Sequence, residues 1–141
     1  MSSPLGRIMA LDLGEKRIGI ALSDPLRMIA KADRVIKRRS RKEDYAIYRR
    51  IIEESSVTLV LVGLPLLLDG EDSQQTKWVR NYSEQLASEI AVPLELWDEG
   101  FSTVEAEEAL KLGGVRRKKL RDRVDAVAAA VILQSYLDAK R

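Results

Sequence analysis

The sequence of 141 residues contains neither cysteine nor histidine. Those two absences exclude disulfides, thiolate nucleophiles, imidazole bases and the usual zinc ligands. Any catalysis must therefore depend on carboxylates, hydroxyls, lysine, arginine or tyrosine. A bound metal would take oxygen ligands from the side chains, which favours Mg²⁺ or Mn²⁺ over zinc or copper.

The chain also lacks an apolar run long enough to cross a bilayer, and the first residues, Met1 to Pro4, have no signal-peptide hydrophobic region. We therefore expect no membrane association and a soluble, cytoplasmic protein, with which the absence of cysteine is compatible. Hydrophobic residues make up 45% of the chain, and no break in composition divides it. This predicts a single domain over residues 1–141 with a sizeable core.

The net charge of +2 is small, so the distribution of charge is more informative than its sum. Basic residues gather in two segments, 34–42 and 111–123, whereas acidic residues dominate 69–72 and 95–108. Basic loops beside carboxylates would suit a polyanionic substrate. A solvated surface is the simpler interpretation of such runs, and without further evidence it is the preferred one.

Alternation and turn chemistry predict an α/β layered domain with a mixed five-stranded sheet flanked by helices. The strands are expected at 7–13, 18–22, 28–37, 57–63 and 92–97. The helices are expected at 41–55, from 72 or 73 to 90, from about 103 to 112, and at 120–139. The first two strands form a hairpin around the turn at 14–17, and the strand at 57–63 is apolar throughout, as buried parallel strands are.

Carboxylates stand at the ends of several of these elements, where a buried charge otherwise has no reason to be. They are Asp12, the pair Asp98 and Glu99, and Asp125. Element ends can meet in one cleft, because ligands of open α/β sheets collect beyond the carboxyl ends of the strands. Such a cluster would hold one or two Mg²⁺ or Mn²⁺ ions about 4 Å apart and hydrolyse a phosphodiester. The simpler alternatives are an Asp12 that hydrogen-bonds its turn and an Asp125 that complements a helix dipole.

The residues around these carboxylates resemble the YqgF/RuvX family, the Holliday-junction-resolvase-like proteins of bacteria. Residues 12–24 read D-L-G-E-K-R-I-G-I-A-L-S-D, like the family's opening D-x-G-x-x-R-x-G-x-A-x-S-D. Residues 62–65 with 69–70 resemble its V-G-L-P and D-G segments, 98–103 its D-E-R-x-[ST]-T segment, and 124–134 its final helix. The resemblance spans nearly the whole chain, so it is far more specific than any one motif.

The resemblance implies an RNase H-like fold and a metal-dependent nuclease. It implies Asp12, Glu99 and Asp125 as metal ligands and catalytic residues, with Asp98 as the alternative to Glu99. Arg17 would either neutralise Asp12 or grip a phosphate. Lys118 and Lys119 are expected to contact backbone phosphates. The family usually has arginine where this chain has Gly100, so a phosphate contact there is missing or comes from another side chain, such as Arg17.

The implied substrate is the 5′ end of pre-16S ribosomal RNA, with pre-rRNA favoured over branched DNA and the ribosomal small-subunit precursor as a partner. Resolution of Holliday junctions is an alternative implied by kinship with resolvases. A second alternative is a non-catalytic RNA-binding factor for ribosome assembly. A third, an actin-like or sugar-kinase-like ATPase, shares the D-x-G-x-x-x-x-G pattern, but 141 residues leave no room for its second lobe.

Overall fold

The computed structural model describes residues 5–66, 72–98 and 117–141, with side chains in the last segment described from residue 126 onward. The strands are β1 (Arg7–Leu13), β2 (Arg17–Ser23), β3 (Ala30–Lys37), β4 (Val57–Leu64) and β5 (Leu94–Asp98). The helices are α1 (Arg41–Glu54), α2 (Gln74–Ser88) and α4 (Arg117–Ala139). The helix expected at about 103–112 and the turn at 69–70 lie outside the described residues.

The five strands form one sheet in the order β3-β2-β1-β4-β5. The strands β1, β4 and β5 are parallel, and β2 is antiparallel to both of its neighbours. The expected mixed sheet and its hairpin are therefore confirmed, and β3 forms one edge of the sheet. The helices α1 and α2 make the two crossovers that parallel neighbours require.

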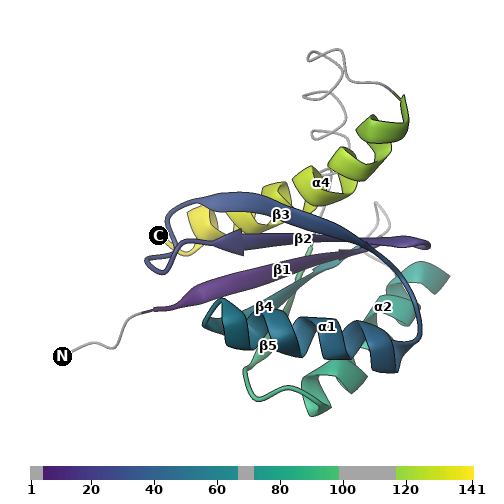
Figure 1. Cartoon of the computed structure of the whole chain (residues 1–141), viewed down its shortest axis with the longest axis horizontal. Helices are drawn as coiled ribbons and strands as arrows, with labels where there is room; N and C mark the ends of the chain where they lie inside the picture. The colour runs from purple at the N-terminus through teal and green to yellow at the C-terminus, as the bar shows by residue number, and fades with distance from the viewer. Residues whose placement is uncertain (1–4, 67–71, 99–116) are drawn as a thin grey trace.

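The helices α1 and α2 cover one face of the sheet and α4 covers the other (Figure 1). Each face carries a separate apolar core. Alternate residues of β1 divide between them, with Met9 and Leu11 facing α1 and α2, and Ile8 and Ala10 facing α4. Because both faces of β1 and β4 are covered, these strands need apolar residues at nearly every position. An acidic residue in β1 is therefore exceptional.

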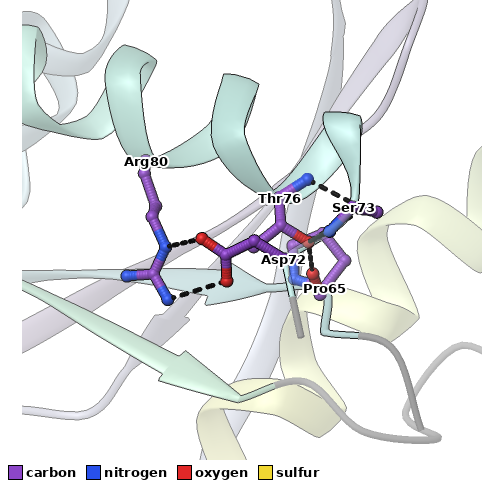
Figure 2. Close-up of polar contacts among 5 residues, drawn as sticks. All are labelled: Pro65, Asp72, Ser73, Thr76 and Arg80. Carbon is purple, nitrogen blue, oxygen red and sulfur yellow. Dashed lines mark hydrogen bonds and ion pairs between the residues drawn. The ribbon is translucent and has the colours of Figure 1, made fainter. Parts of the chain in front are cut away.

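The N-terminus of α2 is hydrogen-bonded to the residue that follows β4 (Figure 2). Ser73 caps the helix in a reciprocal box with Thr76, whose hydroxyl donates to the Pro65 carbonyl. Arg80 makes a two-pronged ion pair with Asp72 at 2.8 and 3.2 Å. These contacts place the first turn of α2 beside the carboxyl edge of the sheet.

Several element boundaries differ by one to three residues from the sequence-based expectation. The strand β5 starts at Leu94 because Pro93 has no N–H to give to a ladder, although its carbonyl accepts from Val60 N–H at 2.9 Å. The helix α2 ends at Ser88, and α4 begins at Arg117 instead of near Leu120. The earlier start of α4 moves Asp125 from the first turns of the helix into the third turn.

Candidate active site

The carboxyl ends of the three parallel strands meet at one edge of the sheet, as expected for the site. One row of partners runs through Leu11, Val62 and Leu96. Asp12 is one residue beyond this row in β1, and Asp98 is two residues beyond it in β5. Because β4 lies between β1 and β5, these two strands are about 10 Å apart at this edge, which is twice the usual spacing of neighbouring strands.

Asp12 is half-buried near the end of β1, opposite Gly19 of β2. It shares the strand face of Ile8 and Ala10, both of which pack in the core beneath α4. Asp12 thus presents its carboxylate on the α4 side of the sheet, next to the turn that joins β1 to β2.

Asp98 is exposed at the end of β5 and lies on the other face of the sheet. Leu94 and Leu96, which share its strand face, pack against the core beneath α1 and α2, whereas Trp97 packs against the α4 core. The structure therefore does not bring Asp98 onto the face of Asp12. Glu99, the next residue, lies outside the described residues.

Arg17, the first residue of β2, is half-buried on the same face as Asp12. Asp12 pairs with Gly19, so Arg17 is its diagonal neighbour across the hairpin, a relation in which long side chains can reach each other. The turn between them closes through Gly14, whose N–H donates to the Arg17 carbonyl at 2.8 Å. The register thus places Arg17 across the hairpin from Asp12.

Asp125 lies on α4, one turn before Ala128 and Ala129, which are buried against the sheet. The C-terminal part of α4 lies by the start of β3 (Figure 1). The side-chain amide oxygen of Gln134 accepts a hydrogen bond there from the Ala30 N–H at 2.9 Å. The part of the helix with Asp125 therefore points toward the carboxyl edge. The helix dipole interacts little with a carboxylate in the third turn, because its effect fades beyond the first turn. The side chains of Asp125, Lys118 and Lys119 lie outside the described ones.

The motif residues Ser23 and Asp24 lie at the opposite end of the sheet and build a turn. The Ser23 hydroxyl accepts from Ile8 N–H at 2.9 Å, and the Asp24 carboxylate accepts from the N–H groups of Met28 and Ile29 at 2.7 and 2.8 Å. The Ile29 N–H contributes most to a pKa of Asp24 below its usual value. Their part in the motif is structural, and they are distant from Asp12.

Oxygen donors are the only ligands that the candidate set offers, and they suit a hard divalent cation. Where side chains are described, no three Asp, Glu, His or Cys residues come together as a metal site. Of the expected ligands, only Asp12 has a described side chain. The described helices include none that could span a membrane.

Sequence reasoning missed one group near this edge, formed by Arg38 and Trp78. The Arg38 guanidinium lies 4.3 Å from the centroid of the Trp78 ring and donates to the Gly14 carbonyl at 3.1 Å. The basic segment 34–42 was the available signal, but its link to a tryptophan 40 residues later could come only from the packing of α2.

The sheet order, the two crossovers and the helix layers define an RNase H-like α/β fold of the resolvase type. Thermus thermophilus RuvC bound to a Holliday junction substrate aligns with a TM-score of 0.59 at 16% identity, over 96% of this chain and 95% of that one. Fowlpox virus resolvase with Holliday junction DNA aligns with a TM-score of 0.56 at 13% identity, over 95% and 98%. These likenesses confirm the expected fold.

The family model RuvX, described as Holliday junction resolvase, matches residues 6–139, and the chain therefore belongs to the RuvX family. A Koribacter versatilis protein named "Putative pre-16S rRNA nuclease" is 40% identical over 135 residues, which cover 96% of this chain and 88% of that protein. A protein of the same name from Anaeromyxobacter is 43% identical, over 95% and 98% of the two chains. The resemblance seen in the motifs is thus confirmed.

Proposed function

We propose that this chain is a divalent-metal-dependent nuclease that processes the 5′ end of pre-16S ribosomal RNA. The observation that carries the proposal is the half-buried Asp12 at the carboxyl edge of the sheet, in a chain that matches the RuvX family over residues 6–139. The family and the names of the relatives support a hydrolase of phosphodiester bonds.

The proposed ligands of Mg²⁺ or Mn²⁺ are Asp12, Glu99 and Asp125. Strand alternation supports Glu99 over Asp98, because a continued β5 would turn residue 99 to the face of Trp97 and Asp12. The placement of α4 supports Asp125, since its third turn points toward the same edge. When bound, the metal would lower the pKa of an attacking water and stabilise the leaving oxygen.

The remaining residues of the proposal bind the substrate. Arg17 would hold a phosphate beside Asp12, and its planar guanidinium suits two-pronged contacts with phosphate oxygens. Lys118 and Lys119, at the start of α4, would contact neighbouring phosphates without reading sequence. We also propose that residues 1–141 act as one domain, in the cytoplasm, on the ribosomal small-subunit precursor.

The test compares four variants in cleavage of end-labelled pre-16S leader RNA with Mg²⁺, Mn²⁺ or EDTA. We expect Asp12→Asn, Glu99→Gln and Asp125→Asn to lose roughly 10²-fold or more in rate, as removal of a ligand worth several kcal/mol requires. Asp98→Asn is the matched control and should retain activity, because Asp98 lies on the other face. Loss of activity in Asp98→Asn with activity kept in Glu99→Gln would contradict the ligand assignment.

Holliday junction resolution is the second candidate, favoured by the description of the family. A synthetic four-way junction in the same assay distinguishes the two. If the junction is nicked symmetrically and the RNA is left intact, the substrate is branched DNA and not pre-rRNA. If neither substrate is cut while wild type and Asp12→Asn bind RNA equally, the chain is a non-catalytic assembly factor.

A further inference from the structure

A pocket of about 490 Å³ opens beside the β1–β2 turn, on the face of the sheet that carries α1 and α2. It lies next to the candidate active site, because Leu13 and Gly14 in its wall directly follow Asp12. Three segments far apart in sequence meet here: the turn, the residue after β3 and the first turns of α2. Among the described residues, its wall also includes Glu15, Arg38, Gln74, Gln75 and Trp78.

The Arg38 guanidinium is held in place by two contacts. Its carbon lies 4.3 Å from the centroid of the half-buried Trp78 ring, and its Nη1 donates to the Gly14 carbonyl at 3.1 Å. The two contacts restrict the motion of the guanidinium over the ring, so the pair forms a cationic surface on the wall of the pocket. Little conformational entropy remains to be lost when a planar ligand stacks on it.

A second guanidinium reinforces the positive charge of this surface. Arg41 lies 5.7 Å from the Trp78 ring, and its Nη1 donates to the neutral amides of Asn81 and Gln85 at 2.8 and 2.7 Å. Among the ion pairs of the described residues, none involves Arg38 or Arg41. Two guanidiniums so close together make this surface attractive to a polyanion.

We propose that this pocket binds an unpaired nucleobase of single-stranded nucleic acid, stacked on the Trp78–Arg38 surface. The amides of Gln74 and Gln75 can both donate to and accept from the edge of a base. Glu15 in the same wall disfavours a phosphate in the pocket and suits a base that donates hydrogen bonds. The inference rests on the proposed function and narrows its substrate to a strand that is unpaired next to the cut.

The position of the pocket explains why a nuclease would use it. A base held beside Gly14 keeps the attached backbone at the carboxyl edge, where Asp12 lies two residues earlier on the opposite face. The strand would cross this edge from the pocket to the carboxylates. A base within a duplex has both faces covered by its neighbours, so a fully paired substrate could not use the stacking surface.

The test uses the fluorescence of Trp78 as a direct reporter. The sequence has two tryptophans, and Trp97 packs on the other face, 5.2 Å from the Tyr136 ring, so Trp97→Phe leaves Trp78 as the single tryptophan. This variant is titrated in EDTA, which prevents cleavage, with a single-stranded RNA, a duplex, a four-way junction and a mononucleotide. We expect the single strand to quench the fluorescence at lower concentration than the other three ligands.

Variants at the stacking surface then measure its contribution, in binding of end-labelled single-stranded RNA, because replacing Trp78 removes the fluorescent reporter. Replacing Trp78 by Leu should weaken single-strand binding by roughly 5- to 100-fold, the range for loss of one stacked base, while Trp78→Phe should keep most of the affinity. Arg38→Lys, which keeps the charge but not the plane, should fall between wild type and Arg38→Gln. The exposed Arg50, later on α1, gives the charge-matched control Arg50→Gln, which should change affinity little.

The outcomes separate this proposal from the nuclease proposal. If Asp12-dependent cleavage is found but the single strand leaves Trp78 unquenched, the pocket assignment is wrong and the nuclease stands. If quenching of Trp78 by the single strand and weaker single-strand binding by Trp78→Leu are found without any cleavage, the pocket assignment stands and the nuclease fails. Equal quenching by duplex or by mononucleotide would overturn the assignment to an unpaired base within a strand.

Discussion

Asp44 has no exposed surface, yet each of its carboxylate oxygens accepts a hydrogen bond. Arg39 N–H donates to Oδ1 at 3.0 Å, and the Tyr82 hydroxyl donates to Oδ2 at 2.9 Å. The Tyr48 and Tyr82 hydroxyls lie 2.9 Å apart, which extends the network. A side chain of α1 is thereby joined to α2 through a polar contact inside an apolar layer, where an unpaired partner would be costly.

We expect a double-mutant cycle to reveal this link. Asp44→Ala and Tyr82→Phe should each lower the free energy of unfolding by about 1–3 kcal/mol, because each leaves a buried polar partner unpaired. The double variant should cost less than the sum by about 1 kcal/mol. Urea unfolding of the four proteins measures this coupling.

The control for the cycle is Tyr45→Phe. The Tyr45 hydroxyl donates to the Tyr82 backbone carbonyl at 2.7 Å and makes no hydrogen bond with Asp44. Its loss should therefore couple weakly with Asp44→Ala. Additive effects of Asp44→Ala and Tyr82→Phe, to within about 0.3 kcal/mol, would show that the hydrogen bond contributes nothing of its own.

At the scale of elements, the β1–β2 turn is a tightly constrained connection next to the candidate site. A Cβ on Gly14 would lie 2.5 Å from the Arg17 carbonyl oxygen, a backbone atom that cannot move without opening the turn. Gly14→Ala should therefore destabilise the protein by about 1–3 kcal/mol, as overpacking does. It should also lower nuclease activity, since Asp12 and Arg17 flank the turn.

Thermal unfolding and cleavage assays check this expectation together. Glu15→Ala is the matched control for stability, because the exposed Glu15 side chain lies in the same turn without a steric restriction on alanine. An unchanged melting temperature for Gly14→Ala would mean that the turn relaxes at little cost, and would remove the steric reason for glycine there.

The helices and strands are largely predictable from the sequence. For some of them, the sequence does not tell which side faces which core. In β1 a single acidic residue interrupts an apolar run, so the sequence alone marks Asp12 as a candidate. In β5 the residues Leu94, Leu96 and Trp97 are apolar on both faces. Alternation there cannot tell which of Asp98 and Glu99 shares the face of Asp12.

The helix α4 shows the same limit in a different form. Its residues 126–133 are apolar all round, and the spacing predicts a packed side with Val127, Val131 and Ile132, with the alanines at 126 and 128–130 close to a sheet. In the structure Val127 and Val131 are half-buried, whereas the buried side of the helix is formed by Ala128, Ala129, Ile132, Leu133, Tyr136 and Leu137. A helix without a clear polar face does not reveal from its period alone which side meets the sheet.

At the scale of the whole molecule, the charge of the protein changes little around neutral pH. Without histidine or cysteine, few side chains change charge between about pH 6 and 9, so stability should be nearly constant there. The buried tyrosines affect the stability only above that pH range. Burial raises the pKa of Tyr45 to about 12 and shifts those of Tyr48 and Tyr82 upward as well.

We therefore expect alkaline unfolding driven by these tyrosines. Above about pH 10 the unfolded chain releases phenolic protons that the folded chain keeps, so the folded state binds more protons and its stability falls as pH rises toward about 12. Each such tyrosine adds up to about 1.4 kcal/mol of loss per pH unit. The decisive comparison is with Tyr48→Phe, which should be less stable than wild type at neutral pH but lose less stability on going to high pH. Circular dichroism and tyrosinate absorbance, followed together, should change in one transition; tyrosinate forming in a protein that is still folded would contradict the burial of these hydroxyls.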